Sequence, residues 1–185
     1  VENGDAEYLI IHDEHLATLG ELNAEQEHIA PDRVFVVGKV PSGLNAWQSL
    51  IDGQRSEFSA PSTVALDDLM NIQYTSGTTG FPKGCMLSHR YWVTIGKVNA
   101  FRDGRRFERI LAATPFFYMD PQWLLLMALY QRATLYAARR QSSSRFMTWL
   151  REHRINFCLF PEIVFKEPPD PRDRDNAIVR VNVYG

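Results

Sequence analysis

The segment YTSGTTGFPKG, residues 74–84, concentrates residue types that bind phosphate oxygens. Gly77 and Gly80 permit backbone angles that are closed to other residues, and they let a ligand approach the amide hydrogens closely. Lys83 adds one mobile positive charge. Four hydroxyl donors complete the segment: Thr75, Ser76, Thr78 and Thr79. By composition alone the segment is either an anion cradle or a flexible hairpin turn with accidental hydroxyls.

The spacing within this segment excludes one large class of phosphate loop. A Walker loop needs a second glycine five positions after the first, followed directly by lysine and then serine or threonine. Here Gly77 is followed five positions later by Pro82, and Lys83 is followed by Gly84. The segment is therefore not the loop of a Walker-type NTPase.

The bulk composition predicts one sizeable domain with a hydrophobic core, because 45% of the 185 residues are hydrophobic and 23% are charged. A net charge of -2 provides no field for a polyanion, so we expect no nucleic-acid partner. The longest apolar run, residues 123–130, is too short for a transmembrane segment. Cys85 and Cys158 show no metal or redox spacing, which favours separate reduced thiols and a cytoplasmic protein.

The elements that must position the phosphate-binding residues follow an alternating pattern. Apolar runs rich in branched and aromatic residues predict strands at 8–11, 34–37, 110–112, 133–137, 157–160 and 178–183. Helical patterns lie between many of these runs. Strand and helix in alternation predict an α/β fold, a layered and mainly parallel sheet flanked by helices. Residues 41–68 read as a surface connection with one short helix near Trp47.

Polar residues mark the expected starts of the helices. Asp13 precedes leucines at helical spacing, Ser88 precedes the pattern of residues 91–98, and serines at 142–144 precede another amphipathic run. In FFYMDPQWLLLM, residues 116–127, Asp120 is placed as a cap and the following proline as the first turn.

Residues 67–90, DDLMNIQYTSGTTGFPKGCMLSHR, resemble the phosphate loop and flanks of the adenylate-forming (AMP-binding) superfamily, which includes acyl-CoA synthetases, luciferases and adenylation domains of peptide synthetases. The resemblance implies that Lys83 is catalytic and that the segment binds the ATP phosphates, with magnesium bridging them. The implied phosphate-binding residues are Thr75, Ser76, Gly77, Thr78, Thr79, Gly80 and Lys83. No structural metal site is expected from the sequence.

A weaker resemblance covers residues 8–37 and 110–165, the second of which resembles one wall of the family's acid-binding pocket. The family often has proline, two aromatic residues and histidine where this chain has residues 115–118, PFFY. The aromatic wall is kept, and a phenol replaces the imidazole. We expect Phe117, Tyr118 and Trp123 to line an acyl-substrate pocket, although the same aromatics suit a core helix. Medium or long acyl chains of fatty acid metabolism and aryl acids fit equally.

The implied reaction is that of an ATP-dependent carboxylate–CoA ligase: a carboxylic acid and ATP give an acyl-AMP and pyrophosphate, and the thiol of coenzyme A then displaces AMP. In the resembled family the adenine, ribose and lid residues come later in the chain. Residues 1–185 are therefore expected to be an inactive fragment of the AMP-binding N-terminal domain, without the C-terminal lid. A non-catalytic nucleotide-binding or interaction module and an amino-acid-adenylating domain stay open as alternatives.

Overall fold

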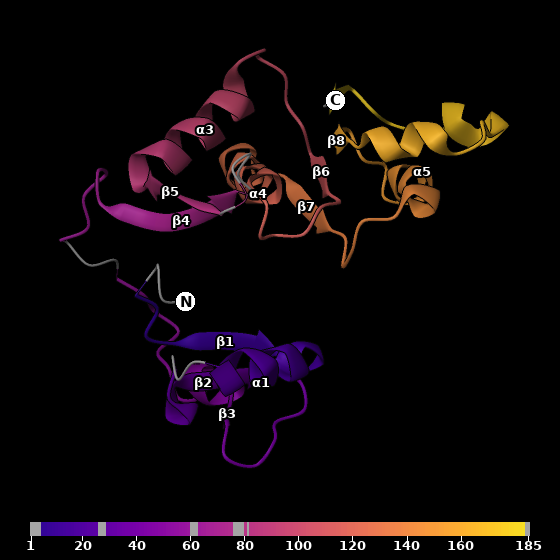
Figure 1. Cartoon of the computed structure of the whole chain (residues 1–185). Helices are drawn as coiled ribbons and strands as arrows, with labels where there is room; N and C mark the ends of the chain where they lie inside the picture. Colours follow the sequence, from indigo (N-terminus) through magenta and orange to yellow (C-terminus); the bar gives the residue numbers. More distant parts are fainter. Residues whose placement is uncertain (1–4, 26–28, 60–62, 76–79, 81, 184–185) are drawn as a thin grey trace. The chain divides into compact units, whose positions relative to one another are not determined.

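The computed structural model describes residues 5–25, 29–59, 63–75, 80 and 82–183. The chain divides into two compact units, Val1–Ser62 and Thr63–Gly185 (Figure 1). This division falls inside the stretch 41–68, which the sequence analysis interpreted as a surface connection within one domain. That one domain extends over residues 1–185 stays a prediction.

The first unit is a small parallel sheet with the strand order β1-β2-β3. Its strands are β1 (Leu9–His12), β2 (Val34–Val37) and β3 (Asn45–Ala46). A single 3-10 turn, Asp13–His15, leads from β1 into α1 (Leu16–Glu25), and α2 (Gln48–Ile51) is the short helix expected near Trp47. The sheet is held by parallel pairing from Leu9 opposite Val34 to His12 opposite Val37.

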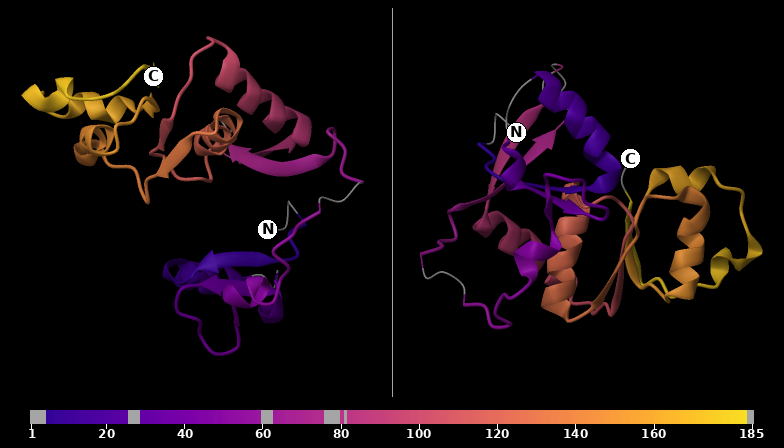
Figure 2. Two further views of the ribbon diagram at one scale, coloured as in Figure 1. Left: turned by 180° about the vertical axis from the view of Figure 1, so that it is seen from behind. Right: turned by 90° about the horizontal axis from the view of Figure 1, so that it is seen from below.

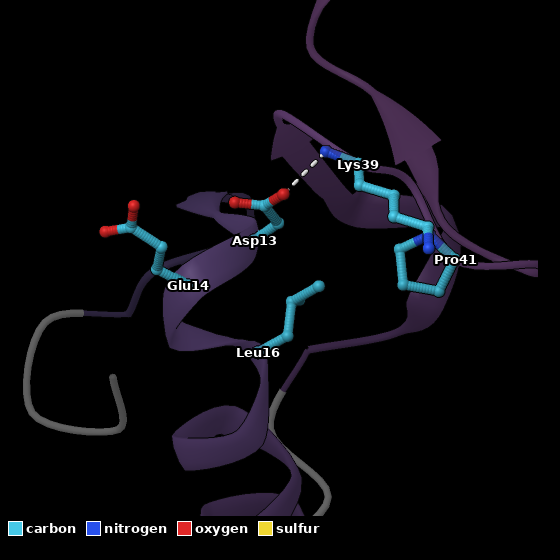
Figure 3. Close-up of a pocket in the computed structure, with 5 residues that line it drawn as sticks. All are labelled: Asp13, Glu14, Leu16, Lys39 and Pro41. Atoms are coloured by element: carbon cyan, nitrogen blue, oxygen red, sulfur yellow. Dashed lines mark hydrogen bonds between the residues drawn. The ribbon is translucent and has the colours of Figure 1, made fainter.

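Asp13 does not cap a helix, contrary to the sequence-based expectation. His12 caps the 3-10 turn, and the Asp13 carboxylate accepts a hydrogen bond of 2.7 Å from the backbone N–H of Lys39 (Figure 3). The neighbouring Gly38 has φ +104°, and a Cβ there would lie 2.7 Å from the carboxylate. Asp13 therefore connects the 3-10 turn after β1 to the segment after β2. A groove of about 420 Å³ lies beside this contact.

The second unit contains a four-stranded, fully parallel sheet with the order β7-β6-β8-β9. Its strands are β6 (Arg109–Ala112), β7 (Thr134–Ala137), β8 (Phe157–Phe160) and β9 (Arg180–Val183). Its helices are α3 (His89–Phe101), α4 (Met119–Gln131) and α5 (Ser143–Glu152). Two 3-10 segments, Glu162–Lys166 and Pro171–Arg174, lie between β8 and β9. The predicted α/β class with a mainly parallel sheet is confirmed.

Both faces of this sheet are covered, with α4 on one face and α5 on the other (Figure 2). Successive side chains of a strand point to opposite faces, so alternate residues of β6 enter different cores. Ile110 and Ala112 pack with Trp92, while Leu111 packs with Phe146. Two-sided burial explains why β6 and β8 read as continuous apolar runs rather than alternating ones.

The helix starts follow local capping chemistry. The Ser88 hydroxyl accepts from the backbone N–H of Tyr91 at α3, and the Ser142 hydroxyl accepts from that of Arg145 at α5, so both predicted serine caps are confirmed. The cap predicted at Asp120 was wrong, because α4 begins at Met119. Asp120 lies in the first turn, where its negative charge favours the helix dipole.

Helices α3 and α4 approach closely at Gly96. A Cβ at this position would lie 2.6 Å from the Cβ of Leu126 in α4, so glycine is needed for the crossing. At the far end of α4, Gln131 is 7% exposed. Its amide accepts from the N–H of Phe107 and donates to the carbonyls of Ala100 and Arg105. One buried side chain therefore joins α3, α4 and the loop that enters β6.

The remaining sequence expectations concern thiols and membranes. Cys85 is exposed and Cys158 is buried, and both are free, as predicted. Burial raises the pKa of the Cys158 thiol to about 12. Within the described ranges, no helix is long and apolar enough to cross a membrane.

Candidate functional site

The glycine and hydroxyl segment connects the two strands of an antiparallel hairpin, β4 (Leu69–Thr75) and β5 (Lys83–Ser88). Thr75 and Lys83 face each other at the loop end of the hairpin, and both are exposed. Gly80 has φ +90°, a conformation that favours glycine. The predicted ligands Ser76, Gly77, Thr78 and Thr79 lie outside the described residues.

Gly84 is required by packing rather than by flexibility. It lies opposite Tyr74 in the hairpin, and a Cβ at Gly84 would be 2.7 Å from Cγ2 of Ile72 and 3.4 Å from the Tyr74 ring. The last glycine of the segment thus lets these two side chains cover the strand directly after Lys83. Sequence reasoning assigned no role to this residue.

Polar contacts fasten the base of the hairpin to α3. The guanidinium of Arg90 pairs with the Asp67 carboxylate through Nε–Oδ1 at 2.6 Å and Nη2–Oδ2 at 2.9 Å. Hydrogen bonding to Arg90 lowers the pKa of Asp67 below its ordinary value of 3.8. The indole N–H of Trp92 donates to Asn71 Oδ1 at 2.8 Å. The direction of the hairpin is therefore set by the helix that follows it.

Two glutamines connect the hairpin to the predicted aromatic wall. Gln73 of β4 donates to the carbonyl of Phe117. The amide nitrogen of Gln122 lies 3.2 Å from Gln73 Oε1, 2.9 Å from the Phe116 carbonyl and 3.1 Å from the Tyr118 carbonyl. The structure thus brings the β4–β5 hairpin and the turn 115–118 together. Neither glutamine belongs to a motif that sequence reasoning recognised, so both were missed.

The three aromatic residues predicted for the acyl pocket occupy different environments. Phe117 is 66% exposed and Tyr118 is 51% exposed, with ring centroids 4.3 Å apart. Trp123 is 7% exposed and packs edge to face on Phe157 in the core. Two of the three residues are accessible to a ligand, and Trp123 has the packing role that the sequence analysis left open.

Comparison with known proteins agrees with this arrangement of hairpin, helix and parallel sheet. Residues 1–167 match the family described as AMP-binding enzyme. The chain belongs to this family. A rice (Oryza sativa subsp. japonica) protein named 4-coumarate--CoA ligase 3 is 31% identical over 138 residues, which cover 70% of this chain and 25% of the relative. A Shigella dysenteriae serotype 1 (strain Sd197) crotonobetaine/carnitine--CoA ligase is 27% identical over 149 residues, covering 77% of this chain and 29% of the relative.

Solved structures of adenylate-forming enzymes share the fold. The N-terminal domain of FACL13 from Mycobacterium tuberculosis superimposes with a TM-score of 0.74 at 18% identity, over 97% of this chain and 44% of that one. The anthranilate CoA ligase AuaEII, solved with anthranoyl-AMP, gives 0.74 at 20% identity over 85% of this chain and 31% of that one. The chain therefore has the fold of part of an AMP-binding enzyme's N-terminal domain, and it spans about a quarter of the length of the curated relatives it matches.

Proposed function

We propose that this chain supplies the phosphate-binding part of an ATP-dependent carboxylate–CoA ligase, as a portion of its N-terminal domain. Family membership and relatives named as CoA ligases support the proposal. The observation that carries it is the contact of Gln73 with Phe117, because it joins the signature hairpin to an exposed aromatic wall. A nucleotide and an acid must meet at such a junction for the first half-reaction.

The chemistry asks the protein to overcome repulsion between two anions. A carboxylate attacks the α-phosphorus of ATP, its oxygen forms the new P–O bond, and pyrophosphate leaves with the electron pair of the broken bond. In this proposal the hydroxyls and amides of residues 75–80 hold the β and γ phosphates. The ammonium group of Lys83, at the start of β5, stabilises the negative charge that develops on the departing pyrophosphate. The ordered strands give Lys83 a defined starting position relative to Thr75.

In this proposal magnesium binds at the hairpin only together with the nucleotide, through the phosphate oxygens. The described residues contain no cluster of three or more histidine, cysteine, aspartate or glutamate side chains that could hold a metal ion. The described hairpin residues offer hydroxyl, amide and ammonium groups, which suit anions. A magnesium ion bound to phosphate oxygens would neutralise part of their charge. Coenzyme A enters the proposal as the thiol co-substrate of the second half-reaction.

The acid itself is proposed at the level of class. Phe117 and Tyr118 present two adjoining exposed rings, which suit an aryl group or the apolar chain of a fatty acid. A free acid would lie with its carboxylate toward the hairpin and its apolar part on these rings. The cytoplasmic location that the two free cysteines indicate stays a prediction.

Carboxylate-dependent pyrophosphate exchange on the full-length gene product tests the proposal. We expect exchange with at least one acid of a panel of aryl, fatty and amino acids. Lys83→Ala should lower the exchange rate by about 100-fold to 1,000-fold, the usual effect of removing one charge-stabilising group. Lys97→Ala, which removes an exposed lysine from α3, is the matched control and should retain the wild-type rate.

Two results would count against the ligase, and a third would count against the role of Lys83. Absence of exchange with every acid would contradict a catalytic role and favour a non-catalytic nucleotide-binding module. Exchange restricted to amino acids, without thioester formation on addition of coenzyme A, would favour an adenylation domain. Equal rates for Lys83→Ala and Lys97→Ala would remove the phosphate role of Lys83.

A further inference from the structure

A basic groove of about 390 Å³ lies in the second unit at the edge of the parallel sheet opposite the candidate site. Its loop, residues 104–106, precedes the amino end of β6, whereas the turn 115–118 follows the carboxyl end of that strand. Four strand residues separate the two edges, which corresponds to about 13 Å. The groove is therefore distinct from the nucleotide and acid positions proposed above.

Three arginines line the groove: Arg105, Arg106 and Arg132. Among the described residues, none of these guanidinium groups has an ion-pair partner, and the nearby Asp103 carboxylate is already paired with Arg180. Helices α3 and α4 end here, and each carboxyl terminus contributes about half a negative charge. Three cations against about one negative charge leave an excess of about two positive charges.

Hydrogen bonds from a buried side chain hold the loop that lines the groove. The buried amide of Gln131 donates to the carbonyl of Arg105 at 2.9 Å and accepts from Phe107 at 2.5 Å, which fixes the loop that carries Arg105 and Arg106. Arg132 has φ 55° at the end of α4, a left-handed position where glycine is usual. An arginine here adopts a backbone conformation that is strained for any residue with a Cβ atom.

The groove also has an apolar side. Phe101 is 53% exposed and Tyr130 is 38% exposed, with ring centroids 6.0 Å apart in an edge-to-face arrangement. Arginine and tyrosine next to one another are typical of the central residues of protein interfaces. A nucleic acid would need a broader basic field, and the chain carries a net charge of -2. A short acidic peptide with an apolar side chain complements both the cations and the rings.

We propose that this groove docks an acidic segment of a protein partner. Carboxylates of the segment pair with Arg105, Arg106 and Arg132, and an aromatic or aliphatic side chain between them rests on Phe101 and Tyr130. The guanidinium fork accommodates carboxylates in a bidentate manner, which gives the contact its direction. The proposal does not depend on the ligase reaction, since no group in the groove takes part in it.

Fluorescence anisotropy with three labelled probes tests this proposal on the wild-type chain. The probes are a peptide of alternating glutamate and phenylalanine, the same peptide with glutamine in place of glutamate, and an oligothymidylate of equal charge. We expect the acidic peptide to bind most tightly and its affinity to fall as sodium chloride rises. Equal binding of the glutamine peptide, or tighter binding of the oligothymidylate, would overturn the proposal.

Variants of the groove provide the second arm. Arg105→Glu/Arg106→Glu should weaken binding of the acidic peptide by at least about tenfold, and Arg132→Glu should act in the same direction. Arg140→Glu, an exposed charge reversal outside the groove lining, should bind within about twofold of the wild type. Should a charge-reversed protein fail to fold by circular dichroism, Arg105→Gln/Arg106→Gln replaces it. Unchanged affinity in folded groove variants would refute the assignment.

Discussion

Replacing Gln131 with leucine is expected to destabilise the second unit strongly, although the two side chains have similar volumes. The Gln131 amide is 7% exposed and makes three hydrogen bonds with backbone groups of Phe107, Ala100 and Arg105. Leucine provides neither a donor nor an acceptor. The N–H of Phe107 and the carbonyl of Ala100 would then be left without a partner beneath the surface.

The size of the effect follows from these groups. Each buried backbone group without a partner costs about 1–3 kcal/mol. The Arg105 carbonyl borders the groove, where water can reach it, and adds little. Leucine buries more apolar surface than glutamine and returns about 1 kcal/mol. The free energy of unfolding should therefore fall by about 1–5 kcal/mol, which lowers Tm by about 4–20 °C at about 4 °C per kcal/mol.

Urea unfolding followed by tryptophan fluorescence measures this change, because Trp92 and Trp123 lie in the same core. Gln141→Leu removes an exposed glutamine as the matched control and should change the unfolding free energy by less than about 0.5 kcal/mol. Gln131→Glu keeps the shape of the side chain but removes its hydrogen-bond donors when the carboxylate is ionised. Its ionised carboxylate cannot donate to Ala100, so its folded pKa should be raised and its stability should fall as pH rises through that pKa.

The reasoning fails if Gln131→Leu unfolds within about 0.5 kcal/mol of the wild type with an unchanged slope in urea. It also fails if Gln131→Glu gains stability as pH rises. Either outcome would mean that the three backbone groups find other partners, and that Gln131 does not fix the loop before β6.

Three further outcomes follow from the packing and the charges. Gly96→Ala should lower the unfolding free energy by about 1–3 kcal/mol in urea unfolding, because its methyl group must displace α4; an equal or higher stability would contradict this. Hydrogen bonding from Arg90 lowers the pKa of Asp67 from 3.8. The wild type should therefore have a higher Tm than Asp67→Asn above about pH 4, and this difference in Tm should disappear as pH falls through the folded pKa of Asp67. A difference that grows in acid would contradict the pairing. Thiol titration at pH 8 should detect Cys85 alone in the native protein and Cys158 only after unfolding, since Cys158 is buried with a pKa raised to about 12; two fast thiols would contradict that burial.

Local patterns were sufficient for the fold class and for most element positions. The six predicted strands all occur, with ends shifted by no more than two residues. In β6 and β8, burial on both faces of the sheet requires the runs of branched and aromatic residues that made them recognisable. Ser88 and Ser142 were recognised as caps because their hydroxyls act within three residues of chain. The caps expected at Asp13 and Asp120 failed because each carboxylate has another partner, the Lys39 N–H and the Trp123 indole.

The sequence by itself determined the signature of residues 74–84 and the family resemblance, since both depend on residue types at fixed spacing. Only the tertiary structure decided which distant residues meet. Gln73 reaches Phe117 across 44 positions, and Gln131 reaches Ala100 across 31. Such contacts depend on how helices cross and which strands pair. These are properties of packing over the whole unit, and no local pattern of residues encodes them.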